Sequence, residues 1–188
     1  WTTASTSWGW RTKTGNSAAR SMSDSPFRIV PYGRERHGDG PWRVVSAVFE
    51  EYGFPFAEND YDADLLRPEE FYDGIRGWFW VAEDALGEVA GCVGLSDEGD
   101  GEFELHRLYV LASARGHQLG ERLTRLVIER AREAGARRLV LFSDVHFSHA
   151  HGVYRRCGFR NDRFRYAPDP WQSREWGFVM EFPEGEGE

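Results

Sequence analysis

The stretch ELHRLYVLASARGHQLGERL, residues 104–123, decides the fold, because a glycine-containing turn joins a strand pattern to a helix pattern. Alternation over 102–110 predicts a strand, with Phe103, Leu105, Arg107 and Tyr109 on one face and Glu104, His106, Leu108 and Val110 on the other. Apolar residues at spacings of three and four over 118–134 predict a helix that ends at Gly135. LVLF at 139–142 predicts a strand covered on both faces, so the order indicates a parallel crossover.

Further elements flank this unit on both sides. Upstream, the patterns predict a strand at 27–30, a helix at 41–52, a short helix from Pro68, and an antiparallel hairpin of 77–84 with 87–96. Downstream, they predict a helix from Ser148 to Gly158 and strands at 159–166 and 174–182. The sequence therefore predicts an α+β fold with one parallel crossover in an otherwise antiparallel sheet.

Size and composition narrow the class of protein. The chain has 188 residues, of which 40% are hydrophobic, enough for one core and one domain. A net charge of -8 argues against nucleic-acid binding, and no window approaches the roughly 18 apolar residues of a membrane span. Cys92 and Cys157 lie far apart, which indicates neither a disulfide nor a metal-type pair and favours a reducing cytoplasm.

The two ends of the chain differ in composition from its middle. Residues 1–25 lack apolar periodicity and predict a disordered N-terminal extension, ahead of a domain at 26–184 and an acidic tail at 185–188. Met22 indicates a native start behind an upstream extension, and a transit peptide is the alternative.

The turn at 112–123 carries the first chemical signal. Gly116 and Gly120 lead into a helix N-terminus, where free backbone amides and the helix dipole favour a bound phosphate, and Arg115 adds a cation. Taken alone, such a turn is as often a simple tight connection. The residues by themselves leave both interpretations open.

Two spaced motifs resemble the GNAT acetyltransferase superfamily. The acyl-CoA signature of that family falls at 115–120, with Gln118 where a glycine is usual, and its second element falls at Tyr154, Gly158 and Phe159. The resemblance implies a GNAT-like mixed, mostly antiparallel sheet with one parallel βαβ crossover and helices on both faces. It also implies acetyl-CoA as cosubstrate.

The resemblance further implies which residues form the site. The main chain of Leu108, Tyr109 and Val110 would hold the pantetheine arm. The diphosphate would be bound by Arg115, Gly116, His117, Gln118, Leu119, Gly120 and Glu121. Tyr154 matches the general acid that protonates the departing thiolate, and Glu104 matches a general base. Phe147 stands where many relatives carry an asparagine that contacts the cofactor.

Several residue patterns allow more than one role. A desolvated Glu104 would have the raised pKa that suits a base, but His106, Asp144 or a water are alternatives. The spacing of His146, His149 and His151 is poor for a metal, so we expect none, and Cys157 is expected to be a buried thiol. The acidic residues of 50–70 could attract a cationic acceptor or form a solvated surface. These are Glu50, Glu51, Glu58, Asp60, Asp62, Asp64, Glu69 and Glu70.

Together these observations predict an N-acetyltransferase that moves the acetyl group of acetyl-CoA to a primary amine by direct attack in a ternary complex. The acceptor stays open between a small-molecule amine, possibly cationic, and a protein N-terminus or lysine. We expect neither a nucleic acid nor a membrane as partner, and the family makes a homodimer an alternative to a monomer. The competing hypothesis is a catalytically silent acyl-CoA sensor or interaction module.

Overall fold

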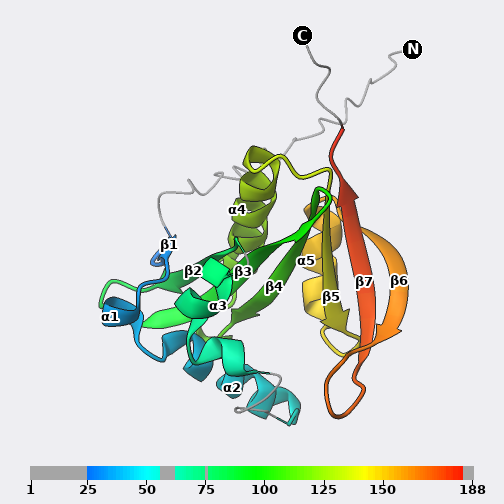
Figure 1. Cartoon of the computed structure of the whole chain (residues 1–188). Helices are drawn as coiled ribbons and strands as arrows, with labels where there is room; N and C mark the ends of the chain where they lie inside the picture. Colours follow the sequence, from blue (N-terminus) through cyan, green and yellow to red (C-terminus); the bar gives the residue numbers. More distant parts are fainter. Residues whose placement is uncertain (1–24, 56–61, 75, 184–188) are drawn as a thin grey trace, which may run out of the picture.

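The computed structural model describes residues 25–55, 62–74 and 76–183, in which one mixed sheet is flanked by helices (Figure 1). Residues 1–24 of the predicted extension and the tail at 185–188 lie outside the described residues. The strands are β1 Arg28–Pro31, β2 Trp78–Glu83, β3 Val89–Gly99, β4 Glu102–Val110, β5 Arg138–Asp144, β6 Arg160–Tyr166 and β7 Arg174–Glu181. The helices are α1 Arg34–His37, α2 Gly40–Tyr52, α3 Pro68–Gly74, α4 Leu119–Glu133 and α5 Ser148–Arg156, with single 3-10 turns at Ala63–Leu65 and Ala112–Ala114.

The sheet has the order β1-β2-β3-β4-β5-β7-β6. Among the described strands only β4 and β5 are parallel, and α4 connects them, so the predicted crossover and the α+β class are confirmed. The short helix α1 was not predicted, because four residues carry no readable periodicity.

Helices cover both faces of the sheet, as predicted. The apolar residues form two cores, where the composition predicted one. On one face, Leu123 and Val127 of α4 and Val153 of α5 belong to one core with Val93 and Leu95 of β3. On the other face, the core is formed from α2, α3 and the strands by Val44, Val45, Leu65, Tyr72, Phe79, Val81, Val89 and Cys92. Removing these side chains from water is the main driving force that holds the helices on the sheet.

The predicted faces of β4 are wrong beyond His106. Gly94 pairs with His106 but Cys92 pairs with Tyr109, so β4 carries one more residue than β3, a β-bulge at Arg107, whose φ is +51°. After the bulge the side chains exchange faces. Leu108 and Val110 join the core that contains Phe103 and Leu105, whereas Tyr109 packs on the opposite core.

Ion pairs from a distant segment hold this bulge in place. Arg107 is only 12% exposed, and its guanidinium donates to Asp62 Oδ1 at 2.6 Å and to both carboxylate oxygens of Asp64 at 2.5 and 3.0 Å. Burial opposes the charge on Arg107, but the two carboxylates outweigh it and raise the pKa of the side chain. On the other side of the bulge, the Cys92 thiol donates to the main-chain oxygen of Arg107 at 3.2 Å.

The two parallel strands separate soon after they pair. Their register runs only from Glu102 opposite Arg138 to Leu105 opposite Leu141. Beyond that point β4 and β5 diverge (Figure 1), and residues of both strands line one cavity. The bulge in β4 therefore lies at the opening between the strands.

Candidate active site

A cavity of about 1360 Å³ lies between the diverging ends of β4 and β5. It brings together Glu104, Leu108, Tyr109, Val110, Arg115, Gly116, Gln118, Leu119, Gly120, Glu121 and Tyr154, all predicted from the sequence. His117 is the exception, since its ring packs edge-on against Phe27 at 5.4 Å and does not line the cavity.

The loop before α4, where the sequence predicts the cofactor diphosphate, forms one end of this cavity. Gly116 and Gln118 have φ values of +85° and +56°, and these two left-handed residues turn the chain so that the helix begins at Leu119. A glycine is usual at position 118 because this conformation suits it, and glutamine accepts it at a cost of about 1 kcal/mol. A Cβ added at Gly120 would meet nothing within 4 Å. The first amides of α4 are thus accessible to an anion, at the positive end of the helix dipole.

Arg115 already has an acidic partner. Its two terminal nitrogens donate to the carboxylate oxygens of Glu51 at 2.6 and 2.7 Å, and this hydrogen bonding raises the pKa of Arg115 and lowers that of Glu51. Any bound diphosphate must share this arginine with α2 or displace Glu51 from it.

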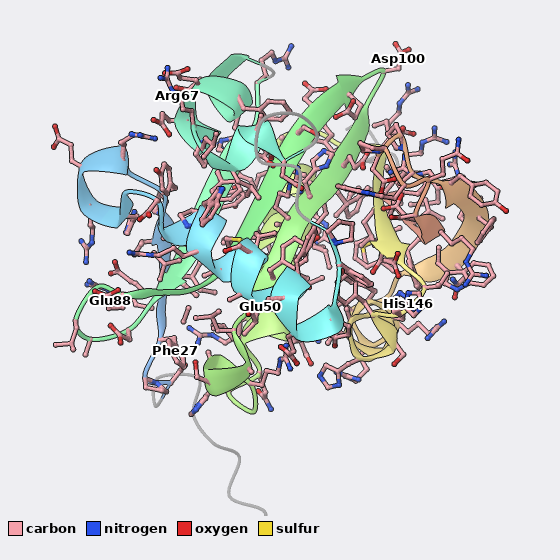
Figure 2. All side chains as sticks on the ribbon, turned by 90° about the horizontal axis from the view of Figure 1, so that it is seen from below. Phe27, Glu50, Arg67, Glu88, Asp100 and His146 are labelled. Atoms are coloured by element: carbon pink, nitrogen blue, oxygen red, sulfur yellow. The ribbon has the colours of Figure 1, made fainter. Side chains whose placement is uncertain are left out.

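The end of α2 meets the β5–α5 loop beside the cavity (Figure 2). The rings of Tyr52 and Phe147 are 4.7 Å apart, and Phe54 lies 5.3 Å from Phe147 and 5.7 Å from His146. Phe147 therefore serves as an aromatic contact between two elements, where an asparagine would offer a polar group.

Tyr154 projects from α5 and is 4% exposed. Burial raises the pKa of its phenol, and a hydrogen bond with Ser143 only partly opposes the shift. The phenol is consequently protonated throughout the neutral range, which is the state that a general acid requires.

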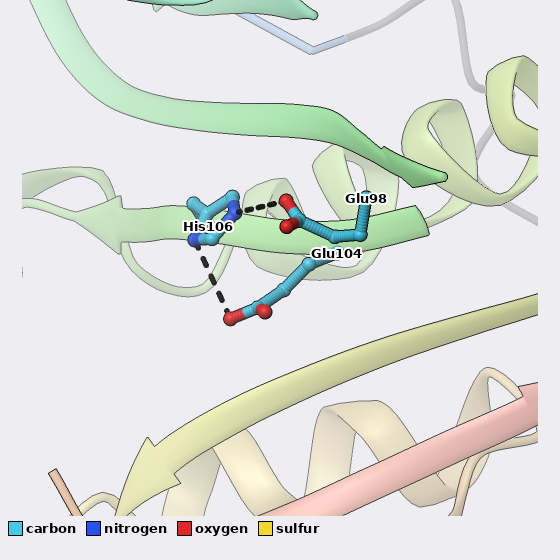
Figure 3. A group of neighbouring side chains, drawn as sticks. All are labelled: Glu98, Glu104 and His106. Carbon is cyan, nitrogen blue, oxygen red and sulfur yellow. Dashed lines mark ion pairs between the residues drawn. The ribbon is translucent and has the colours of Figure 1, made fainter. Parts of the chain in front are cut away.

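Glu104 and His106 lie side by side on β4, with Glu104 Oε1 3.5 Å from His106 Nδ1 (Figure 3). The Glu104 side chain is 18% exposed. Burial raises the pKa of this carboxyl, while His106 and Arg165 oppose the shift. A carboxylate with a raised pKa is suited to accept a proton near neutral pH.

Two residues of β3 complete this group, and neither was predicted from the sequence. His106 Nε2 lies 2.7 Å from Ser96 Oγ and 3.9 Å from Glu98 Oε1, and the Ser96 hydroxyl donates to Glu98. Ser96 is opposite Glu104 in the β3–β4 register. No motif marks Ser96 or Glu98, so only the strand pairing reveals them.

The far wall of the cavity comes from β6, β7 and the loop between them. The Arg165 guanidinium lies 3.3 Å above the Phe142 ring and donates to Glu175 at 2.7 Å. Burial raises the pKa of Glu175, and Arg165 opposes the shift. Asp169 accepts hydrogen bonds from the amides of Trp171 and Ser173, which shapes the loop that presents Trp171 to the cavity. No sequence pattern predicts this wall, because its residues come from separate strands and a loop.

The three histidines considered for a metal do not converge. His146 Nδ1 contacts Asp144 Oδ1 at 2.6 Å, while the buried His151 contacts the main-chain oxygen of Asp144 at 3.1 Å. Burial lowers the pKa of His151. Cys157 is buried in the core beneath α4 and α5, and burial raises the pKa of its thiol.

Most described members of the acidic 50–70 segment contact arginines. Asp62 and Asp64 bind Arg107, and Glu51 binds Arg115. Glu69 and Glu70 contact arginines as well, at 3.7 and 3.1 Å, and Glu58 and Asp60 lie outside the described residues. The described part of the segment is therefore largely neutralised within the chain.

A sequence model of the Acetyltransferase (GNAT) family matches residues 43–159, more than half of the chain. The chain belongs to this family. An Escherichia coli protein described as an uncharacterized N-acetyltransferase, YjgM, is 31% identical to this GNAT protein over 125 residues, covering 63% of this chain and 74% of that protein. Such relatives, together with the family match, make the protein an acyltransferase.

Solved structures agree in fold. A GNAT acetyltransferase from Staphylococcus aureus superposes with a TM-score of 0.71 at 21% identity, over 82% of this chain and 98% of its own. An acetyltransferase from Salmonella typhimurium, solved with its cofactor acetyl-CoA, gives a TM-score of 0.67 at 17% identity, over 86% and 97%. Within the described residues of this GNAT protein, no helix is both long and apolar enough to cross a membrane.

Proposed function

We propose that this GNAT protein transfers the acetyl group of acetyl-CoA to a primary amine by direct attack in a ternary complex. The observation that carries the proposal is that four features line a single cavity. They are the accessible N-terminus of α4, the bulged end of β4, the protonated Tyr154 and the desolvated carboxylate of Glu104. These are the groups that amine acetylation needs.

The residues of the cofactor end fit acetyl-CoA. The amides from Gly116 to Glu121 would hold the diphosphate, with Arg115 as a further donor, because a helix N-terminus favours negative charge. The main chain of β4 from Leu108 to Val110 would pair with the pantetheine amides. When bound, the cosubstrate supplies an activated acetyl thioester.

Glu104 and Tyr154 would then handle the protons. Glu104 takes a proton from the acceptor ammonium, which frees the nitrogen lone pair for attack on the acyl carbon. As the new C–N bond forms and the C–S bond breaks, Tyr154 gives its proton to the leaving sulfur. The nitrogen then loses its second proton to water, and water returns a proton to the Tyr154 phenolate. A phenol can protonate a thiolate of pKa about 8.5 when it is well placed.

The carboxylates that line the cavity around Glu104 and the far wall favour a cationic acceptor. Glu104, Asp144, Asp169 and Glu175 line the cavity, whereas the nearby Arg165 has Glu175 as its partner. Trp171 adds an aromatic face that is 46% exposed, and cations bind such faces. A small-molecule amine is favoured, with a protein N-terminus or lysine as alternatives.

A calorimetric titration with acetyl-CoA and with CoA, followed by a thiol-release assay on a panel of amino acids, polyamines, aminoglycosides and peptides, tests the proposal. We expect micromolar binding and amine-dependent release of CoA. Binding without release would favour the silent sensor instead. Absence of binding would overturn the assignment of the 115–121 loop.

The setting of the enzyme is also a proposal. We place the acetyltransferase domain at 26–184. We also place the protein in the cytoplasm, because its two cysteines are buried free thiols that suit a reducing compartment. Gel filtration at several protein concentrations would distinguish a monomer from a homodimer.

A further inference from the structure

We infer that Ser96 and Glu98 are positioning residues for proton transfer: they hold His106 with its hydrogen on Nε2, so that Nδ1 accepts the proton that Glu104 removes from the acceptor. The inference rests on the proposed function and extends it from the cavity to β3. It begins from four side chains on one face of the β3–β4 hairpin, three of which are drawn in Figure 3.

The hydrogen-bond directions determine the tautomer. The Ser96 hydroxyl has one hydrogen, and it donates that hydrogen to Glu98. Ser96 Oγ can then only accept from His106 Nε2 across the 2.7 Å contact. A neutral His106 therefore carries its hydrogen on Nε2 and presents the Nδ1 lone pair to Glu104 at 3.5 Å.

Burial supports this chain of contacts. Ser96 is fully buried, so water cannot compete for its hydroxyl. The nearby His106 and the hydrogen bond from Ser96 lower the pKa of Glu98 to about 2. Glu98 is accordingly ionised at every working pH. It acts as a fixed negative charge that orients Ser96 and stabilises the imidazolium of His106. It does not itself accept the proton.

The proton balance follows from these positions. An N–H bond of the acceptor ammonium breaks as an O–H bond forms on Glu104, and that O–H then breaks as an N–H bond forms on His106 Nδ1. The Nε2 hydrogen stays in place, and the imidazolium returns its Nδ1 proton to water, to which the side chain is 30% exposed. Glu104 is left ionised for the next turnover.

The same three ligand-type side chains, Glu98, Glu104 and His106, lie within 4.8 Å of one another and could be taken for a metal site. The ring orientation argues against it. Nε2 is already in contact with Ser96 Oγ at 2.7 Å, so only Nδ1 offers a lone pair, and Glu98 contacts the ring from the Nε2 side. With Nε2 held by Ser96, the ring is oriented to accept a proton from Glu104 at Nδ1.

Other charged groups also act on Glu104. Arg165 of β6 lowers its pKa, whereas Glu98 of β3 and Glu175 of β7 raise it. Tyr72 of α3 is also coupled to Glu104: burial raises the pKa of its phenol, and the charge of Glu104 adds to that rise. A test must therefore change Glu98 without disturbing Arg165 or Glu175, which belong to the opposite wall.

The first measurement is the tautomer. Histidine ring 15N NMR of the whole protein, assigned with His106→Gln, should report the Nε2–H form in the wild type and mixed tautomers in Glu98→Gln and Ser96→Ala. A wild-type ring protonated on Nδ1 would overturn the inference. Because this readout needs no acceptor, it is independent of whether the proposed function holds.

The second measurement is the pH profile of CoA release with any amine that the panel identifies. For Glu98→Gln we expect kcat to fall about tenfold, with KM for acetyl-CoA unchanged. The acid limb of kcat/KM should move to lower pH by about half a unit, because the Glu98 charge that helps to raise the pKa of Glu104 is lost.

Asp100→Asn provides the matched control. Asp100 lies at the tip of the same hairpin (Figure 2), and its left-handed φ of +49° suits asparagine. This variant removes the same unit of charge and should keep the wild-type profile. A Glu98→Gln enzyme with the wild-type kcat and profile would refute the positioning role, whereas a wild type that releases no CoA with any amine would refute the proposed function.

Discussion

The two ends of the cavity are built in different ways. At the proposed cofactor end, the wall is lined mostly by one continuous segment from Leu108 to Glu121, whose main-chain amides are proposed to bind the ligand. At the acceptor end, Glu104, Arg165 and Trp171 converge from separate elements and offer side chains. A backbone site depends on the path of the chain, whereas a side-chain site depends on which residues the fold brings together.

If the acceptor end carries the chemistry, Glu104→Gln should have the largest effect. The amide keeps the shape of the side chain but cannot take a proton, so we expect kcat/KM to fall about 10³-fold with acetyl-CoA affinity unchanged. Steady-state kinetics and calorimetry on the same preparations measure the two effects. Glu102→Gln, on the same strand but outside the cavity lining, is the control.

The same variant separates function from stability. Burial raises the pKa of folded Glu104 above its unfolded value, so the ionised carboxylate costs stability as pH rises through the folded pKa. Glu104→Gln should raise the free energy of unfolding by about 1 kcal/mol at neutral pH. The gain should vanish below about pH 4, where the carboxyl is protonated in both states. An equal gain at both pH values would contradict the desolvation of Glu104.

Tyr154→Phe should be the next most severe change. Loss of the acid should lower kcat about 10²-fold while the buried ring keeps its packing. Because burial raises the pKa of Tyr154, the wild-type kcat should show no alkaline decline from this group up to about pH 10. Stopped-flow thiol release checks both. Tyr166→Phe, which removes a hydroxyl from an exposed tyrosine, should leave kcat unchanged.

At the cofactor end, Gly120→Ala should separate binding from folding. The new methyl group meets no protein atom, so the helix should gain up to about 1 kcal/mol. The same methyl group would stand where the diphosphate approaches the amides, and we expect about tenfold weaker binding of acetyl-CoA. Gly152→Ala in α5, outside the cavity lining, should bring a helical gain without loss of affinity. Unaltered affinity in Gly120→Ala would remove the diphosphate from this turn.

The smallest expected effect belongs to Glu51→Gln. Exposed ion pairs contribute little, so release of Arg115 should tighten acetyl-CoA binding only about twofold. Calorimetry at low salt, with Glu50→Gln as the neighbouring control, can resolve this change. Weaker binding in Glu51→Gln would mean that Glu51 orients Arg115 toward the ligand and does not compete with it.

Sequence patterns predicted the elements better than the contacts. The helix expected over 118–134 is α4, and the strand expected over 102–110 is β4, because long periodic segments carry their signal locally. The single turn of α1 carries no such signal. The faces of β4 were predicted only as far as His106, since strict alternation cannot register an inserted residue.

The site divides in the same way. The sequence by itself determined the α+β class, the family, the turn before α4 and the candidate pair Glu104 and Tyr154, because each depends on residues close together in the chain or on a motif. Only the tertiary structure decided that Asp62 and Asp64 anchor Arg107, that Ser96 and Glu98 stand behind His106, and that Arg165 faces Glu104. These contacts depend on strand register and on packing across the sheet, which join residues that no local pattern connects.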